Sequence, residues 1–149
     1  DWSSDVCSSD LKKIGKGITT EQVIMCVQKL KKYHLSHRVV LSFIIGFPWE
    51  DQGMANQTLH FAADLMRKYN AQTNVAWWIP MPSRLWRHRD DYGIKLDDDI
   101  YYDPKCFSNQ EYFFQLRPRI SRADYKQING IFHAYRDLNC PLTAARISP

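Results

Sequence analysis

One long apolar run constrains the fold more than any other part of the sequence. Residues 38–50 read RVVLSFIIGFPWE, in which Val, Leu, Phe and Ile follow one another with little polar alternation up to Gly46. Such a run predicts a strand buried on both faces, as in parallel sheets that helices cover. Ligands of such sheets collect at the carboxyl ends of the strands, where a glycine allows close backbone approach. We therefore expect a binding site at the turn that begins with Gly46.

Helical and strand-like patterns alternate on both sides of this run. A capping box over residues 19–22 precedes apolar residues at helical spacing, which predicts a helix over residues 20–33. The strand over residues 38–47 follows, then a helical pattern that includes residues 59–69, then a second strand over residues 73–79. This alternation predicts parallel β/α units joined by right-handed crossovers. The two strands should therefore be adjacent and parallel.

The composition of the rest of the chain, after residue 82, indicates loops and helices in place of further strands. Residues 83–118 are rich in charged and aromatic side chains, which indicates loops and short helical pieces. Ser121 and Asp124 then form a second capping box ahead of an amphipathic terminal helix. We expect a β/α core over residues 12–90 and a C-terminal loop and helical extension over residues 91–149.

Residues 1–11, DWSSDVCSSDL, resemble the translation of a short sequencing adapter and are interpreted as an artefact outside the fold. The block holds three Asp and no Lys or Arg, so the remaining chain has 20 basic and 13 acidic side chains, a net charge of +7. A basic excess suits an anionic partner, but many of these lysines lie at predicted helix ends and on solvated faces. We do not expect a nucleic-acid partner.

The cysteines at positions 7, 26, 106 and 140 have no metal-ligand spacing, and neither do the histidines. No metal ligand is assigned to the chain. Isolated thiols are typical of a reduced cytosolic protein, so we expect a cytoplasmic location. No apolar run reaches the ~18 residues that a membrane-spanning helix needs, so no membrane span is expected.

Three phrases in a fixed order resemble the C-terminal half of the core of radical S-adenosylmethionine enzymes. They are residues 13–19 (KIGKGIT), residues 42–50 (SFIIGFPWE) and residues 80–86 (PMPSRLW). The family counterparts read like KxIxKGIT, xFIxGFPGET and PxPGTPLY, and the similarity is greatest to the cobalamin-associated and porphyrin-cyclase-like groups. The resemblance implies an α/β fold, a fragment of a partial β/α (TIM-like) barrel of parallel β/α units with a C-terminal helical extension.

Residue by residue, the resemblance implies six positions beside S-adenosylmethionine. Five would contact its adenine, namely Phe43, Ile44, Gly46, Ile79 and Met81, and Lys16 would face its carboxylate. An adenine needs an apolar slot with backbone donors and acceptors, and Lys supplies a point charge for a carboxylate. Phe43 and Ile44 also suit plain barrel core, and Lys16 also suits a solvated helix start.

The chain departs from the family phrases at two places. Ser83 and Arg84 stand where the family has Gly-Thr-Pro, and Trp49 replaces a small residue. Both changes add bulk at the rim of the implied pocket. A cluster of three further aromatic residues suits either stacking on a flat substrate or the apolar core: Trp77, Trp78 and Trp86.

The resemblance also implies what the chain lacks. The cysteine triplet that holds the [4Fe-4S] cluster, and the glycine-rich segment that holds the amino group of S-adenosylmethionine, belong upstream of Lys12. We therefore expect an inactive fragment of a parent enzyme that uses S-adenosylmethionine and a [4Fe-4S] cluster, with cobalamin as a further candidate cofactor. The parent would act on a small-molecule or peptide substrate by radical or methyl-transfer chemistry.

Two alternatives remain, a fragment of a β/α-barrel enzyme without radical chemistry and a basic RNA-binding module. If the chain is a fragment of a barrel, one of its strands has an edge with no neighbouring strand. Unpaired backbone groups and apolar side chains are then exposed together at that edge. We therefore expect the isolated chain to self-associate.

Overall fold

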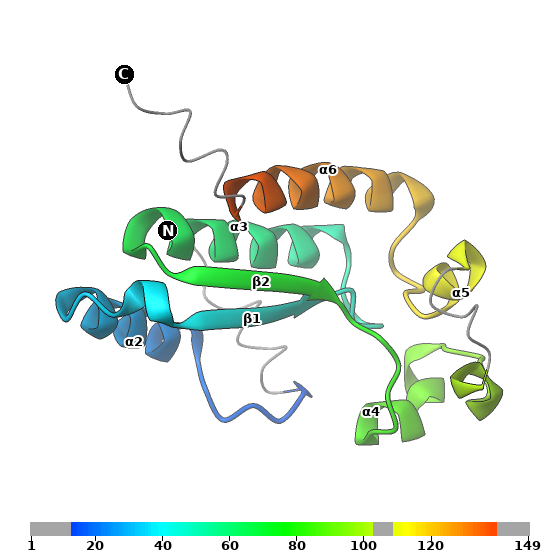
Figure 1. Ribbon diagram of the computed structural model, residues 1–149. Coiled ribbons are helices and arrows are strands. Elements are labelled where there is room, and N and C mark those ends of the chain that lie inside the picture. Colours follow the sequence, from blue (N-terminus) through cyan, green and yellow to red (C-terminus); the bar gives the residue numbers. More distant parts are fainter. Residues whose placement is uncertain (1–12, 103–108, 140–149) are drawn as a thin grey trace.

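The computed structural model describes residues 13–102 and 109–139, which form a mixed α/β structure (Figure 1). Three short 3-10 helices, η1, η2 and η3, span Ser36–Arg38, Arg89–Tyr92 and Asp98–Tyr101. The α-helices and strands are α2 (Thr20–Lys32), β1 (Val40–Ile45), α3 (Gln52–Tyr69), β2 (Gln72–Trp77), α4 (Arg84–Arg87), α5 (Gln110–Gln115) and α6 (Arg122–Asn139).

β1 and β2 form a parallel sheet, as the alternation of patterns predicts. The register runs from Val40 opposite Gln72 to Ile45 opposite Trp77. α3 crosses over between the two strands, and Asp51 caps its start by accepting a hydrogen bond from Met54 N at 3.0 Å. The prediction of adjacent, parallel strands with an intervening helix is confirmed. β1 is shorter than the predicted strand over residues 38–47, and β2 begins one residue before the predicted strand over residues 73–79 and ends two residues before its end.

The two predicted capping boxes are present and start the helices where the sequence indicates. Thr19 N donates to Gln22 Oε1 at 2.9 Å, and Gln22 N donates to Thr19 Oγ1 at 3.3 Å. At the start of α6, Ser121 N donates to Asp124 Oδ2 at 2.9 Å and Asp124 N donates to Ser121 Oγ at 3.2 Å. Each box satisfies backbone N–H groups that the first helical turn cannot pair.

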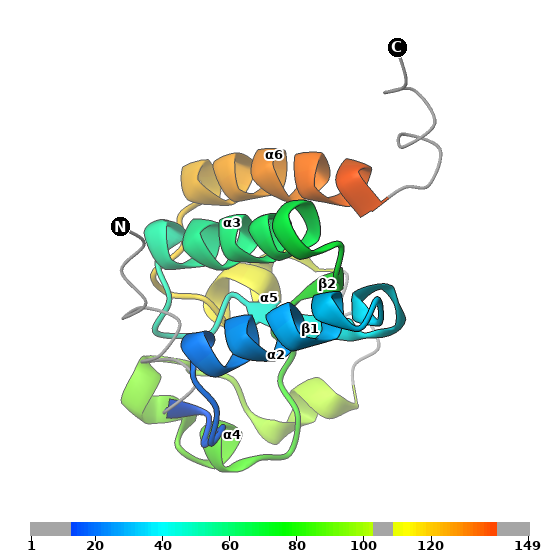
Figure 2. The same cartoon turned by 90° about the vertical axis from the view of Figure 1, so that its left-hand side faces the viewer.

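The three long helices lie on one face of the sheet, with α3 between α2 and α6 (Figures 1 and 2). One apolar cluster joins α3 and α6 to the strands and includes Ile45, Leu59, Val75, Ile128 and Tyr135. A second joins α2 and α3 to β1 through Val27, Leu65, Leu41 and Phe43. The hydroxyls of Thr73 and Tyr135 also lie 2.9 Å apart, which links α6 to β2 inside the core.

The opposite face of the sheet is exposed in the described part of the chain. Val40 and Ile44 are 57% and 46% exposed. Ser42, Gln72, Asn74 and Ala76 on the same face are exposed as well. The prediction of a strand buried on both faces is therefore wrong for this structure. The physical reason is that α2, α3 and α6 all pack on one side, so alternate side chains of β1 have no helix to cover them.

The segment after β2 packs around a third apolar cluster at the carboxyl end of the sheet. Its buried members are Phe47, Trp49, Trp78, Trp86, Ile94, Ile100 and Leu116. The predicted loops and short helical pieces are confirmed here, with residues 103–108 outside the described structure. Trp78 and Trp86 are core residues, so the core interpretation of these two tryptophans is the correct one.

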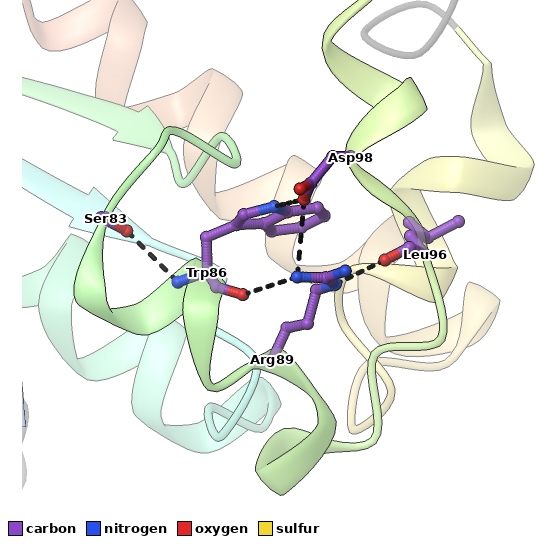
Figure 3. Close-up of polar contacts among 5 residues, drawn as sticks. All are labelled: Ser83, Trp86, Arg89, Leu96 and Asp98. Carbon is purple, nitrogen blue, oxygen red and sulfur yellow. Dashed lines mark hydrogen bonds and ion pairs between the residues drawn. The ribbon is translucent and has the colours of Figure 1, made fainter.

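Hydrogen bonds hold Trp86 in this cluster (Figure 3). Ser83 caps α4 by accepting from Trp86 N at 3.3 Å, and the Trp86 indole donates to Asp98 Oδ1 at 2.8 Å. Arg89 lies 4.8 Å from the Trp86 ring and donates to Trp86 O at 3.2 Å and to Leu96 O at 2.6 Å. The Ser-Arg pair that replaces Gly-Thr-Pro thus starts a short helix.

Two predictions are not tested by the structure. The interpretation of residues 1–11 as an artefact concerns residues outside the described ranges, and the division of the chain near residue 90 stays a prediction. Among the described helices, none is long and apolar enough to cross a membrane.

Candidate functional site

The turn after β1 is built around a buried carboxylate. Gly46 N and Phe47 N both donate to Glu50 Oε2, the second at 3.1 Å, and Glu50 N donates back to Phe47 O at 3.0 Å. Glu50 is 1% exposed. A carboxylate that accepts two backbone N–H groups forms charge-assisted hydrogen bonds, which are stronger than neutral ones. These hydrogen bonds fix the shape of the turn.

Two arginines between α5 and α6, Arg117 and Arg119, attach this segment to the ends of the two strands. Arg117 contacts the end of β2. Its Nη2 donates to Trp78 O directly after β2, and its Nη1 donates to Phe113 O at 3.1 Å. The guanidinium carbon lies 4.0 Å from the centre of the Phe113 ring and 5.3 Å from that of Trp77. Arg119 donates to Trp49 O at 2.9 Å, which attaches the same segment to the turn after β1.

Burial changes the pKa of the charged Arg117 side chain at this end of the sheet. Burial lowers the pKa of the Arg117 guanidinium to about 10, and electrostatic interactions with Glu50 and Tyr125 oppose part of this shift. The guanidinium is therefore still charged at neutral pH. A buried cation and a buried carboxylate thus stabilise one another beside the carboxyl ends of both strands.

The backbone conformation and the surroundings of Gly46 both require a residue without a side chain. Its φ is +78°, a left-handed conformation that favours glycine. A Cβ atom at this position would lie 2.5 Å from Trp77 Cε3 and 2.6 Å from Arg117 Nε. The space that the missing side chain leaves is therefore filled by Trp77 and Arg117.

A pocket of about 330 Å³ opens beside β1 and reaches the turn. Its charged members are Lys16, which is exposed, and Glu50. Three side chains contribute hydroxyls, namely Thr20, Ser42 and Thr58, and the apolar lining comprises Ile14, Ile18, Val23, Leu41, Phe43, Ile44, Phe47 and Phe61. An apolar slot with a few polar groups is the usual chemistry of a small-molecule site.

The structure brings together three of the six residues that the sequence places beside a cofactor. Lys16, Phe43 and Ile44 line the pocket. Gly46 lies in sequence between Ile44 and Phe47, which both line it, but its own contacts are with Trp77 and Arg117. Ile79 and Met81 are exposed and do not line this pocket. The roles of all six toward a ligand stay predictions.

Sequence reasoning missed the contribution of Glu50, Arg117 and Arg119. Glu50 follows Gly46 by four residues, a spacing that suits a side chain folding back on a tight turn. Arg117 and Arg119 lie far along the chain in a segment without periodicity. Their contacts span 39 and 70 residues, so no local signal could have found them.

The described residues do not fit an iron–sulfur cluster. Such a cluster is held by several Cys thiolates, and the free cysteine in the described ranges is Cys26, which is exposed. Within those ranges no group of three His, Cys, Asp or Glu side chains could hold a metal ion.

Comparison with known proteins finds one informative similarity. A stretch of 79 residues is 43% identical to the uncharacterized methyltransferase PH0819 of Pyrococcus horikoshii. This stretch is 52% of the chain and 16% of that protein, so the chain spans a small part of the relative's length. No family model matches the chain, and no solved structure does.

Proposed function

We propose that the chain is part of an S-adenosylmethionine-dependent methyl-transfer enzyme of the radical S-adenosylmethionine superfamily. The observation that carries this proposal is the convergence of Lys16, Phe43 and Ile44 on one pocket beside the carboxyl end of β1. Two of the three sequence phrases that resemble this superfamily, residues 13–19 and 42–50, supply these residues. The similarity to a methyltransferase over half of the chain supports the same class of chemistry.

The pocket offers complementary groups for S-adenosylmethionine, which supplies an activated methyl group when bound. Phe43 and Ile44 would form the apolar wall for the adenine, and Lys16 at the rim would pair with the carboxylate. Glu50 and Arg117 would orient the site indirectly, because they hold the turn at its end. The proposed contacts of Ile79 and Met81 rest on the resemblance alone.

On this proposal the described residues supply part of a partial β/α barrel, and other parts of the parent supply the rest. The cluster would need cysteines outside the described ranges, because the residues in those ranges do not fit it. Cobalamin and a small-molecule or peptide substrate belong to the proposal through the resemblance. No chemical step is assigned to the chain itself.

The complete gene is the first test, because a cysteine triplet beside a strand upstream of Lys13 would support the radical class. Its absence would leave a β/α enzyme without radical chemistry as the better interpretation. The second test is isothermal titration of S-adenosylmethionine into the parent protein. We expect binding that Lys16→Met weakens by roughly tenfold, the loss of one charge-assisted contact.

The matched control is Lys32→Met, which removes an exposed positive charge from the far end of α2. We expect it to leave the affinity unchanged. Titration into the 149-residue chain should show very weak binding or none, because most polar contacts would lie upstream. Equal effects of the two substitutions would remove Lys16 from the site, and submicromolar binding by the isolated chain would contradict the fragment interpretation.

A further inference from the structure

The outward face of α2 carries both positive charge and an exposed apolar side chain. α2 lies at one side of the helical layer, with α3 between it and α6 (Figure 2). Met25, Lys29 and Lys32 follow one another at helical spacing, so they share one face of α2. All three are exposed, whereas Val27 is fully buried in the cluster that joins α2 to α3. The face with Met25 is therefore directed away from the protein core.

The chain directly after α2 continues this surface. His34 N donates to Lys31 O at 3.0 Å. Leu35 N donates to Leu30 O at 2.8 Å, so the chain folds back onto the last turn of the helix. This pair of hydrogen bonds, with His34 in the left-handed conformation at φ +58°, is a common way for a helix to end. Tyr33 and Leu35 are 67% and 40% exposed, and this backbone geometry holds them in place.

No acidic residue interrupts this part of the chain. Between Glu21 and Glu50 the sequence has four Lys or Arg residues and no Asp or Glu. Lys29, Lys32 and Arg38 are exposed, and among the described residues none of them forms an ion pair. We call the surface around the end of α2 the basic corner, and its residues are Met25, Lys29, Lys32, Tyr33, Leu35 and Arg38.

Contacts within the protein explain some of the cations at this end of the molecule. Lys31 Nζ donates to Lys68 O at 2.7 Å, which caps the end of α3. Lys68 pairs with Asp64 at 2.9 Å. Lys29 and Lys32 lie in the last turn of α2, where a cation complements the helix dipole. None of these roles explains why apolar side chains are exposed among the cations.

We propose that the basic corner binds the surface of a membrane that contains anionic lipids. Lys29, Lys32 and Arg38 would lie at the phosphates of the headgroups. Met25 and Leu35 would enter the boundary between headgroups and acyl chains, as the apolar residues of interfacial helices do. None of the residues of the basic corner lines the pocket beside β1, so this inference does not rest on the proposed function.

The combination of side chains favours lipid over other anionic partners. A nucleic-acid strand would use the cations and could stack a base on Tyr33, but it offers no apolar environment to Met25 and Leu35. A second copy of the same surface would bring like charges together. A membrane surface satisfies all three kinds of side chain, because aromatic rings with a polar tip, such as that of Tyr33, favour the level of the headgroups.

Vesicle flotation of the 149-residue chain tests the proposal, because lipid-bound protein rises with the vesicles whereas self-associated protein does not. The chain should float with vesicles of equimolar phosphatidylcholine and phosphatidylglycerol, but not with phosphatidylcholine alone. Lys29→Gln with Lys32→Gln should lower the partition coefficient at least about tenfold, since each removes a cation from the anionic surface. The matched control, Lys126→Gln with Arg136→Gln, removes two exposed charges from α6. It should have a much smaller effect, since exposed charges are screened within about 8 Å.

A second variant, Met25→Gln with Leu35→Gln, keeps the charge and tests the apolar part of the contact. It should lower the partition coefficient at least about threefold. Circular dichroism establishes that each variant is folded. Failure of the chain to float with the anionic vesicles, or flotation that the loss of Lys29 and Lys32 does not weaken, would overturn the proposal. Unchanged flotation of the second variant, together with binding of a single-stranded RNA oligonucleotide through the same two lysines, would assign the surface to nucleic acid instead.

Discussion

At the scale of single residues, the end of the sheet depends on two opposite charges that lie far apart in sequence. Glu50 holds the turn after β1 through two backbone N–H groups, and Arg117 holds the residue after β2 through Trp78 O. Both side chains are nearly inaccessible to solvent. Removing one member of such a pair leaves the other buried without compensation, which costs more than the pair contributes as a whole.

Gly46→Ala should destabilise the protein by about 2–5 kcal/mol, because a side chain at φ +78° is strained and its Cβ would overlap Trp77 and Arg117. The matched control is Gly130→Ala within α6, where an added Cβ meets nothing within 4 Å. This control should stabilise by about 0.5–1 kcal/mol, since alanine favours helix. Urea unfolding followed by circular dichroism measures both, and similar effects of the two substitutions would contradict the packing described at Gly46.

Glu50→Ala should cost about 2–4 kcal/mol in the free energy of unfolding, because two buried N–H groups lose their acceptor and Arg117 loses a nearby negative charge. Glu50→Gln should cost less, since its amide oxygen can still accept. Glu111→Ala, which removes an exposed carboxylate in α5, should stay within about 0.5 kcal/mol of wild type. A Glu50→Ala protein as stable as the Glu111→Ala control would show that the turn does not need its carboxylate.

At the scale of elements, each long helix begins where a short side chain caps it. These caps are local, so the sequence predicted both capping boxes correctly from residues three positions apart. The ends of β1 and β2 were less well predicted. Apolar composition extends beyond the hydrogen-bonded strands into the turns, where Phe47 and Trp78 belong to a separate cluster.

The cap of α6 should respond to acid. Hydrogen bonds from the Ser121 side chain and backbone lower the pKa of Asp124 below its ordinary value of 3.8. A carboxyl whose pKa is lowered by folding stabilises the fold above its unfolded pKa, and this contribution is lost as the pH falls through the folded pKa. The start of α6 should therefore loosen at pH values below the lowered pKa of Asp124.

Carbon-detected nuclear magnetic resonance titration of the Asp124 carboxyl checks this expectation. The measured pKa should lie below 3.8, and Ser121→Ala should raise it toward that value. Ser83→Ala, which removes the cap of α4, should leave it unchanged. A wild-type pKa at or above 3.8 would show that the capping box is absent in solution.

At the scale of the whole molecule, the sheet is incompletely covered in the described ranges. One face carries exposed Val40 and Ile44, and one edge of β1 borders the apolar pocket. Exposed strand edges beside apolar side chains are typical sites of association. The net charge of +7 outside residues 1–11 opposes this only weakly, since exposed charges are screened within about 8 Å at physiological salt.

We therefore expect the 149-residue chain to self-associate. Size-exclusion chromatography with light scattering should show dimers or larger species whose proportion increases with protein concentration. Val40→Lys and Ile44→Lys place like charges on the exposed face and should lower that proportion, whereas Lys29→Gln on α2 should not. A monodisperse, cooperatively unfolding monomer would show that the chain is a complete domain, and the fragment interpretation would then be abandoned.

The sequence by itself determined the order of elements, the parallel pairing of β1 and β2 and the helix starts. These depend on periodicity, caps and the handedness of crossovers, which act over short stretches of chain. The sequence phrases also contain three residues that line the pocket beside β1, namely Lys16, Phe43 and Ile44, and their roles toward a ligand stay predictions.

Only the tertiary structure decided which face of the sheet is covered and how the strand ends are held. The contacts of Arg117 with Trp78 and of Arg119 with Trp49 join residues far apart in sequence, and neither has a local pattern. The same holds for Gly46, because a Cβ atom at this position would overlap Trp77 and Arg117, which lie far away in the sequence. Local chemistry can specify an element, but which distant side chain fills a given space depends on how the elements pack.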